Sequence, residues 1–477
     1  MAGGKIAAKV GRAACPHAAE GWVLATKNTE TTKAMKPSGV AWLGDIPEGW
    51  EMRRLKTCFS IVSGSGFKEH LQGRTDGDYP VFKARDIGKA DVTLNYSKNW
   101  ITSDEVETEG FKIIPANSIL MPKIGEAMRK NSRAISGVAC CVDNNCQGLL
   151  PRMVDVKLSY YLLCSIDVRA FDNGGAIPCI NNQAFLDFSC PLPPLPEQRT
   201  IADYLDEKCG AIDAAVTEAK KGIEEYKAWK KSLIFEAVTG KRRVGAFNAK
   251  TQSRREAEKM KHSGIPWIGE IPEGWKLARL KNCAKVFGRI GFRGYTTADI
   301  VNEGEGALSL SPSNLKDIRM DYAKRTYISW SKYEESPEIK VCKGDIVFVK
   351  TGSSYGKACI VDDMPCEATL NPQLVVLKCF SCHNRYLNYY LQTPLIKYQV
   401  ELIVSGGTIP TMSQEKMGCW KIILPPLSEQ QAIADYLDEK CAAIDAMVAE
   451  KEALIADLEA YKKSLIFELV TGKREVA

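Results

Sequence analysis

Long apolar runs are missing from this sequence. Residues 1–22, MAGGKIAAKVGRAACPHAAEGW, contain no apolar run of about seven residues, which is the minimum for the core of a signal peptide. No later stretch approaches the roughly 20 consecutive apolar residues that a membrane-spanning helix needs. We therefore expect a cytoplasmic protein without a membrane partner, whose 17 cysteines are mostly free thiols.

Catalytic signatures are missing too. The chain has no Asn-Pro-Pro-aromatic or Asp-Pro-Pro-aromatic tetrapeptide of an amino-methyltransferase, and NPQL at 371–374 fails at both later positions. GSSYGKA at 352–358 has one residue too few between its glycines for a phosphate-binding loop, and it ends in Ala instead of Ser or Thr. CFSCH at 379–383 would need further ligands to hold zinc, in a chain with only 4 histidines. We expect no catalytic residue, no cofactor and no metal site in this chain.

What the sequence does contain is a long repeat. IADYLDEKC occurs at 201–209 and again at 433–441, inside matching regions that begin at Pro193 and Pro425. A second repeat opens each half: GVAWLGDIPEGWEMRRLK begins at Gly39, and GIPWIGEIPEGWKLARLK begins at Gly264. Two copies are too few for a solenoid, and 477 residues exceed one hydrophobic core. The pattern predicts a tandem duplication of a whole domain.

The character of each half changes at its proline cluster. Before Pro193 and Pro425, short apolar runs alternate with Gly, Asn and Pro, which is typical of strands and turns. After the cluster, apolar residues recur at steps of four and three, as at Leu437, Cys441 and Ile444. This heptad period predicts one long helix per half that pairs with the helix of the other half. Packing of each helix on its own domain alone is the alternative.

The formal charge is divided unevenly along the chain. Residues 197–240 carry a net charge of −2 and residues 429–472 carry −6, so the rest of the chain carries +14 within a total of +6. Positive charge on two duplicated modules suits binding of a long polyanion at two places. Lysine-rich surfaces also keep proteins soluble, so composition alone leaves nucleic-acid binding open.

These motifs together resemble a known family. W-L-G or W-I-G, then I-P-E-G-W, later G-G-A-I-P or G-G-T-I-P, and finally P-P-L-x-E-Q with I-A-D-Y-L-D before a long helix are similar to the specificity subunit of type I restriction-modification enzymes. The resemblance covers both halves from Met35 onwards. It implies an α+β fold of two mixed, largely β target recognition domains. Two long antiparallel helices would separate them as a coiled coil, with internal duplication and pseudo-two-fold symmetry.

The resemblance also implies a function. Such a subunit is non-catalytic and reads a bipartite target in double-stranded DNA, in a system of phage defence. Its implied partners are two modification subunits, which methylate adenine at N6, and two restriction subunits, which are ATP-dependent endonucleases. S-adenosylmethionine, ATP and Mg are therefore expected in the partners. The alternative is a stand-alone DNA-binding or scaffold protein of the same ancestry.

The predicted domain boundaries follow the two repeats. They are an N-terminal extension at 1–37, target recognition domain 1 at 38–196, a first spacer helix at 197–240, a basic linker at 241–261, target recognition domain 2 at 262–428, and a second spacer helix with a tail at 429–477.

Candidate DNA contacts are expected at corresponding strand ends of the two halves. Arg can bond guanine bidentately and Asn can bond adenine, while glycine lets a phosphate approach the backbone closely. Each candidate could instead be an ordinary loop residue. The candidates are Lys83, Arg85, Lys123, Gly125, Arg129, Lys130, Arg133, Gly174, Gly175, Ser309, Ser311, Asn314, Lys350, Gly352, Lys357, Gly406 and Gly407.

Overall fold

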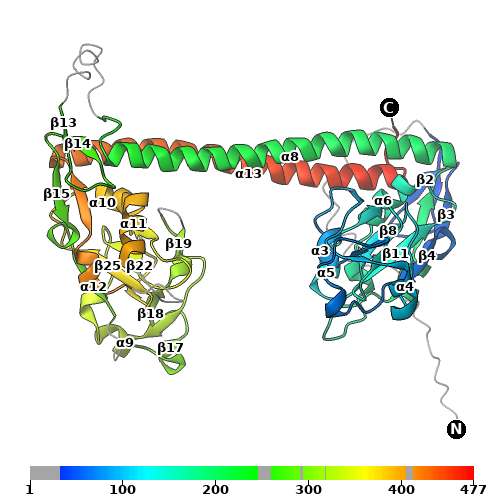
Figure 1. The fold of residues 1–477 in the computed structure, drawn as a ribbon, viewed down its shortest axis with the longest axis horizontal. Helices are drawn as coiled ribbons and strands as arrows, with labels where there is room; N and C mark the ends of the chain where they lie inside the picture. The colour runs from blue at the N-terminus through cyan, green and yellow to red at the C-terminus, as the bar shows by residue number, and fades with distance from the viewer. Residues whose placement is uncertain (1–32, 245–258, 290–293, 317–318, 404–411, 477) are drawn as a thin grey trace, which may run out of the picture. The chain divides into compact units, whose positions relative to one another are not determined.

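The computed structural model describes residues 33–244, 259–289, 294–316, 319–403 and 412–476. Its contacts divide the chain into two units. Unit 1 extends to Lys220 and resumes at Ala453, and unit 2 comprises Lys221–Glu452. Two helices of 44 residues each, α8 (Leu195–Val238) and α13 (Leu427–Val470), contribute to both units (Figure 1).

Unit 1 contains a five-stranded sheet of order β4-β11-β8-β9-β6 and a three-stranded sheet of order β10-β5-β7, with the strand pairs β1–β2 and β3–β12. The strands are β1 (Met35–Pro37), β2 (Asp45–Pro47), β3 (Glu51–Arg54), β4 (Phe59–Ser63), β5 (Tyr79–Phe82), β6 (Thr93–Leu94), β7 (Trp100–Ile101), β8 (Ile119–Pro122), β9 (Ala134–Ser136), β10 (Cys141–Val142), β11 (Cys146–Pro151) and β12 (Ser189–Leu192). The short helices are α2 (Leu55–Cys58), η1 (Glu69–Leu71), α3 (Ala84–Ile87), α4 (Ser103–Glu109), α5 (Glu126–Arg129), α6 (Val156–Ser165), η2 (Val168–Phe171) and α7 (Asn182–Asp187).

Unit 2 contains two four-stranded sheets, of order β16-β25-β22-β23 and β17-β21-β18-β24, with the pairs β13–β14, β15–β26 and β19–β20. The strands are β13 (Met260–His262), β14 (Glu270–Pro272), β15 (Lys276–Arg279), β16 (Lys285–Gly288), β17 (Ile300–Val301), β18 (Gly306–Leu310), β19 (Leu315–Lys316), β20 (Arg319–Met320), β21 (Tyr327–Ser329), β22 (Ile346–Val349), β23 (Ala358–Ile360), β24 (Ala368–Leu370), β25 (Leu374–Lys378) and β26 (Lys421–Leu424). The short helices are η5 (Leu280–Asn282), η7 (Thr297–Asp299), η8 (Pro312–Asn314), α9 (Trp330–Glu334), η9 (Pro337–Ile339), α10 (Asn384–Leu391), α11 (Pro394–Ile403) and α12 (Gln414–Gly418).

The two units share one internal construction. In unit 1, β11 lies between β4 and β8 and is antiparallel to both, and β25 has the same place between β16 and β22 in unit 2. A parallel strand pair accompanies each sheet, β5 with β10 and β18 with β24. Apolar runs such as Ile346–Val349 are buried at every residue, as expected for strands covered on both faces. The duplication in the sequence is therefore a duplication of the fold.

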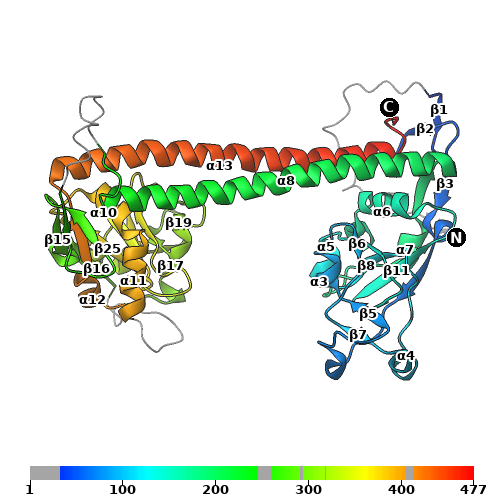
Figure 2. The same ribbon diagram turned by 45° about the horizontal axis from the view of Figure 1, so that its top comes forward.

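The long helices pack on each other as well as on the domains. In both views α8 and α13 run side by side (Figures 1 and 2). In unit 1 Leu205 and Ile212 of α8 share a core with Leu465 of α13, and in unit 2 Leu233 of α8 shares a core with Leu437 of α13. The predicted heptad pairing and fold class are confirmed, and the alternative of packing on one domain alone is wrong. Among the described residues, no helix is both long and apolar enough to cross a membrane.

Paired charges within the helix seam show that the helices are antiparallel. In unit 1 Lys462, late in α13, places Nζ 2.7 and 2.6 Å from the carboxylate oxygens of Asp213, in the first half of α8. In unit 2 Lys230, late in α8, places Nζ 2.6 and 2.8 Å from those of Asp445. Both lysines occupy heptad positions that would otherwise take an apolar residue. A polar group at such a position favours one register over others.

Each long helix ends on a repeated I-P-E-G-W segment. Gly240 and Gly472 have left-handed φ values of 76° and 71°, which glycine adopts without strain at the end of a helix. A Cβ on Gly472 would lie 2.3 Å from Cδ of Pro47, and one on Gly240 would lie 2.5 Å from Cγ of Pro272. In each unit, the end of a long helix is therefore packed closely against the I-P-E-G-W segment.

Candidate nucleic-acid interface

In unit 1 the first predicted residues follow strand β5. The backbone N–H of Lys83 donates to the Asp86 carboxylate at 2.9 Å, which starts α3. Nζ of Lys83 donates to Oε1 of Gln72 at 2.7 Å, so this side chain also ties the loop together. Arg85 is exposed on α3. Of these two candidates, Arg85 is the one presented to solvent.

The second predicted group follows strand β8. Lys123 is half-buried, and Gly125 has a φ of 75° directly before α5, with open space where a Cβ would stand. Arg129 and Lys130 are exposed, and Arg129 forms an ion pair of 2.8 Å with Glu126. The strand end thus presents accessible backbone and two cationic side chains close together in the sequence.

The glycine loop of unit 1 lies against this second group. The candidates of this type are Gly174 and Gly175 in unit 1 and Gly406 and Gly407 in unit 2. The unit 2 pair lies outside the described residues. Gly174 and Gly175 are exposed, and their loop is joined to the end of β8 because the N–H of Gly125 donates to the C=O of Pro178 at 2.7 Å.

Arg133, by contrast, is a buried residue. Its side chain donates to the C=O of Ser132 at 2.8 Å and to Oδ1 of Asn131 at 3.2 Å, and 4% of the residue is exposed. Burial lowers the pKa of its guanidinium group to about 10. A side chain so enclosed reaches no phosphate without rearrangement, so the structure gives Arg133 a supporting position behind the surface.

Two candidates of unit 2 are buried in the same way. Ser309 is 2% exposed and its hydroxyl donates to the Tyr295 hydroxyl at 3.0 Å. Asn314 is 1% exposed, and its amide donates to the C=O groups of Asp321 at 2.9 Å and Lys324 at 2.7 Å. Ser309 thus binds the segment before β17, and Asn314 stabilises the loop after β18, so neither polar group faces a base edge in this structure.

The remaining candidates of unit 2 lie at the end of β22. Gly352 has a φ of 102° and, with Ser311, lines an open hollow of about 320 Å³. Lys350 is half-buried, and this burial lowers the pKa of its amino group. Lys357 is exposed directly before β23. The other residues that line the hollow are Pro312, Ser313, Thr351, Ser353, Ser354 and Gln373.

Sequence reasoning missed the turn that connects the first two groups of unit 1. The N–H of Asp143, at the start of the β10–β11 turn, donates to the C=O of Phe82 at the end of β5, at 3.2 Å. The C=O of Asn145, at the end of this turn, accepts from the N–H of Lys123 after β8, at 2.7 Å. Three strand ends therefore meet at one place, which we call the junction of unit 1.

Unit 2 builds its junction with the same backbone bonds. The N–H of Asn371 donates to the C=O of Leu310 at 2.9 Å, and the C=O of Gln373 accepts from the N–H of Lys350 at 2.9 Å. The available signal was the position of D-N-N at 143–145 and N-P-Q at 371–373 at matching places in the two halves. Ser313, which is exposed where unit 1 has Arg85, was missed as well.

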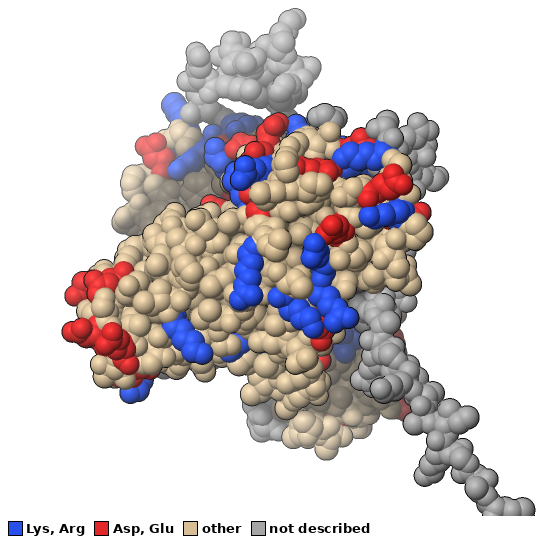
Figure 3. All heavy atoms as spheres, turned by 90° about the vertical axis from the view of Figure 1, so that its right-hand side faces the viewer, with Lys and Arg blue, Asp and Glu red and all other residues tan. Residues whose placement is uncertain are grey.

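Positive charge also gathers away from the junction. Figure 3 shows Lys and Arg side chains on the face of unit 1 that lies at the right of Figure 1, where β3 lies. Arg53, Arg54 and Lys56, from β3 and α2, are exposed. Phe59, just after them, pairs with Pro151 at the end of β11 that is distant from the junction. Charge alone therefore does not locate the candidate interface.

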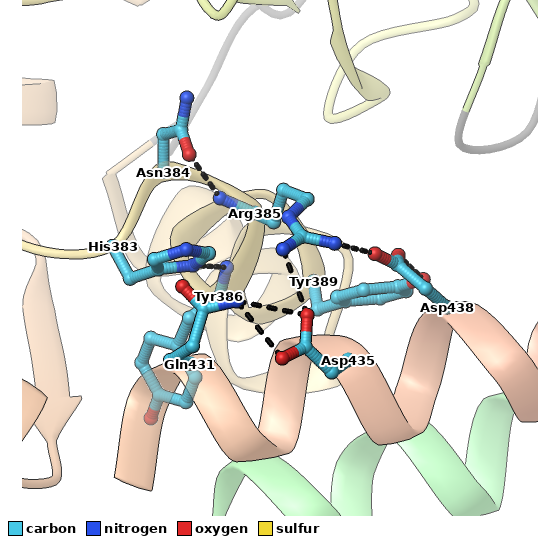
Figure 4. A network of polar contacts seen from close by, with 8 residues as sticks. All are labelled: His383, Asn384, Arg385, Tyr386, Tyr389, Gln431, Asp435 and Asp438. Carbon is cyan, nitrogen blue, oxygen red and sulfur yellow. Dashed lines mark hydrogen bonds and ion pairs between the residues drawn. The ribbon is translucent and has the colours of Figure 1, made fainter. Parts of the chain in front are cut away.

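The repeated I-A-D-Y-L-D motif holds each domain on its helix. In unit 2, Arg385 of α10 forms a 2.8 Å ion pair with Asp435 and a second ion pair with Asp438 (Figure 4). The hydroxyl of Tyr389 donates to Asp438 at 2.7 Å. Hydrogen bonds from Gln431, together with the nearby Arg385, lower the pKa of the Asp435 carboxyl group. We call this set of contacts the clamp of unit 2.

Unit 1 has a clamp of the same form. Lys157 of α6 lies 3.2 Å from Asp203 and 2.6 Å from Asp206, and the Tyr161 hydroxyl donates to Asp206 at 2.8 Å. The sequence analysis assigned these segments to spacer helices. In the structure, both aspartates of each motif also bind a short helix of the domain in their own unit, α6 in unit 1 and α10 in unit 2.

The glutamine of P-P-L-x-E-Q completes the attachment. Gln198 is 2% exposed; its amide donates to the C=O of Pro193 at 2.9 Å and its carbonyl accepts from the N–H of Asp155 at 2.8 Å. Gln430 makes the same two kinds of bond in unit 2, both at 2.8 Å. Helix start and domain are thereby joined by a buried side chain in each unit.

The motifs that suggested chemistry have other structural contexts. GSSYGKA joins two antiparallel strands, β22 and β23, whereas a phosphate-binding loop joins a strand to a helix. Nδ1 of His383 in CFSCH accepts from the N–H of Tyr386 at 3.4 Å and caps α10. Among the described residues, no group of three or more His, Cys, Asp or Glu is placed to hold a metal ion, and the cysteines there are free thiols.

Comparison with known proteins identifies the family. The family model for the type I restriction modification DNA specificity domain matches residues 47–224 and 292–455. The chain belongs to this family. It carries two such domains, one matched in each half, as the duplicated fold requires.

Several relatives match over nearly their whole length. The type I restriction enzyme MjaVIII specificity subunit of Methanocaldococcus jannaschii is 24% identical over 438 residues, which cover 90% of this chain and 94% of the relative. The putative MjaX specificity subunit of the same organism is 26% identical over 456 residues, with 91% and 96% covered. A solved chain from work on complex assembly and conformational transition of the type I R-M system has a TM-score of 0.63 at 15% identity, with 90% and 99% covered, which shows the same fold.

Proposed function

We propose that this chain is the non-catalytic DNA-specificity subunit of a type I restriction-modification enzyme, and that each unit reads one half of a bipartite target through its junction. The observation that carries the proposal is the repetition of the junction. The same strand ends meet in both units through the same backbone bonds, while the exposed side chains differ. A backbone arrangement that is the same in both units, with different exposed side chains, suits two domains that recognise two different DNA sequences.

The side chains near the two junctions differ in chemistry, so the two units would contact DNA in different ways. The exposed residues near the unit 1 junction include Arg85, Arg129 and Lys130, which suit guanine and phosphate groups. The hollow of unit 2 is lined mainly by hydroxyl and amide groups, which suit hydrogen bonding to base edges. The exposed and half-exposed candidates and Ser313 are the proposed DNA contacts. The buried Arg133, Ser309 and Asn314 are kept as supporting residues.

The partners and cofactors follow from the family. We infer that two modification subunits and, in the complete enzyme, two restriction subunits assemble on this chain in the cytoplasm. S-adenosylmethionine, ATP and Mg would then be bound by those partners. The support is membership of the specificity-subunit family and the presence in each unit of one identical helix motif, which can offer similar sites to two copies of one partner.

The decisive experiment is co-expression of the chain with its cognate modification subunit, followed by sequencing of methylated adenines. We expect a complex that methylates one bipartite sequence, and no methyl transfer by the isolated chain with S-adenosylmethionine. A chain that binds DNA but retains no methyltransferase would instead be a stand-alone DNA-binding or scaffold protein. Methyl transfer by the isolated chain would refute a non-catalytic role.

A further inference from the structure

The turn at the centre of each junction is fixed at three points. In unit 1 it comprises Asp143, Asn144 and Asn145. Its first N–H bonds to the end of β5, and its last C=O bonds to the residue after β8. Within the turn, the N–H of Asn145 donates to the Asp143 carboxylate at 3.2 Å. The backbone of this turn is thereby held by two other strand ends and by its own first side chain.

Unit 2 reproduces this turn with different residues. Asn371, Pro372 and Gln373 make the two outer bonds with β18 and with the residue after β22. The N–H of Gln373 donates to Oδ1 of Asn371 at 3.0 Å. The first residue of D-N-N and of N-P-Q supplies a side-chain oxygen that accepts the turn bond, although the residues differ. The geometry is therefore a property of the junction and not of one conserved tripeptide.

The turn buries its first residue and presents its third. Asp143 is 8% exposed and Asn371 is 9% exposed, whereas Asn145 and Gln373 belong to the exposed surface. The middle position is exposed as well, but it holds Asn144 in unit 1 and Pro372 in unit 2, and proline has no side-chain group for a hydrogen bond. The third position is thus where both units present a carboxamide, next to the hollow of about 320 Å³ in unit 2.

We propose that Asn145 and Gln373 are specificity-determining residues, each of which reads one adenine in its half of the DNA target; this inference rests on the function proposed above. A carboxamide accepts from N6 and donates to N7 of adenine in the major groove, and this paired contact distinguishes adenine from the other bases. A carboxamide has no net charge with which to neutralise a phosphate, whereas its neighbouring donor and acceptor match those of adenine. A turn held at three points loses little conformational freedom on binding, which favours discrimination.

The test uses the complex of the full chain with its modification subunit and single substitutions at the two turns. For Asn145→Ala and Gln373→Ala, we expect discrimination at one base pair of one half-site to fall about ten-fold or more, with the other half-site unchanged. Gln373→Glu should shift the preference at that position towards cytosine, because a carboxylate accepts from cytosine N4. Matched controls are Asn95→Ala, directly after β6, and Asn282→Ala on η5, which remove exposed carboxamides. β6 pairs with β9, which in turn pairs with Ile119 and Leu120 of β8 and not with the junction end of that strand.

The readout is the set of methylated sequences, with DNA affinity measured as a function of salt. A uniform loss of affinity with unchanged sequence preference would overturn the inference, since it would mean a backbone contact only. Changes in both half-sites from one substitution would overturn it too. If the unchanged complex methylates no bipartite sequence, the proposed function itself fails. If the complex without substitutions methylates a bipartite sequence and the variants methylate the same sequence with the same preference, only the inference about the turns fails.

Discussion

The contact between the end of α13 and the first I-P-E-G-W segment yields a sharp prediction for Gly472→Ala. A non-glycine residue at the φ of 71° costs about 1–2 kcal/mol. The added Cβ would also lie 2.3 Å from Cδ and 2.7 Å from Cγ of Pro47, and relieving such an overlap costs about 1–3 kcal/mol. We expect Gly472→Ala to destabilise unit 1 by about 2–5 kcal/mol in total.

Gly39→Ala is the matched control in the same unit. Gly39 has a similar φ of 75°, but no atom lies within 4 Å of the position of its Cβ. The control should therefore show the conformational cost alone, about 1–2 kcal/mol. The difference of about 1–3 kcal/mol corresponds to a midpoint lower by roughly 2–12 °C in Gly472→Ala than in Gly39→Ala.

Thermal unfolding of the full chain, followed by tryptophan fluorescence, measures this difference. Trp50 would report directly, because its Cζ3 lies 3.3 Å from the same Cβ position. Equal midpoints for the two variants would refute the argument that the helix end is packed on the tryptophan motif. Unit 2 offers a second comparison, Gly240→Ala against Gly264→Ala, and the same ranking is expected there because Gly264 also has open space at its Cβ position.

Three further predictions concern the helices and the modules. Lys462→Ala should cost about 1 kcal/mol, since this ion pair is partly exposed, and the exchange Lys462→Asp with Asp213→Lys should restore most of it in denaturation measurements. Inserting four residues after both Ala219 and Ala456 should lengthen each helix by about 6 Å and rotate it by about 400°, close to one full turn. Sequencing of methylated sites should then report unchanged half-sites and a gap between them that is longer by about one or two base pairs. An unchanged gap in a folded variant would contradict a spacer role. Exchanging residues 262–428 for those of another family member should change one half of the methylated sequence, and a change in both halves would contradict independent modules.

Local signals account for the parts of the fold that the sequence predicted correctly. The heptad steps at Leu437, Cys441 and Ile444 reflect the period of a helix against a partner, and those residues are buried in the structure. The first predicted spacer helix, 197–240, corresponds to α8 within two residues at each end, and the second was predicted to begin at 429, two residues after α13 begins. The antiparallel direction was implied by family resemblance, and the Lys462–Asp213 contact supplies its physical basis.

The candidate site was predicted less completely, for a physical reason. Strand-to-loop positions such as Arg85 and Asn314 look alike in sequence, whether the side chain turns outward or into the loop. In the structure Arg85 is exposed, while the side-chain amide of Asn314 donates hydrogen bonds to two backbone carbonyl groups. The β10–β11 turn escaped notice because its role depends on hydrogen bonds to Phe82 and Lys123, which lie far away in the chain. DNA contact by any of these residues stays a prediction.

The sequence by itself determined that this protein is a duplicated pair of modules with two long helices, and that it belongs with the specificity subunits. Repetition and heptad period are properties of the chain in one dimension, so they can be recognised without coordinates. The tertiary structure alone decided which strand ends meet, which charged residues are buried, and that the repeated aspartates hold a domain on its helix. These depend on contacts between residues distant in sequence, such as Arg385 with Asp438, whose formation is set by packing and not by local pattern.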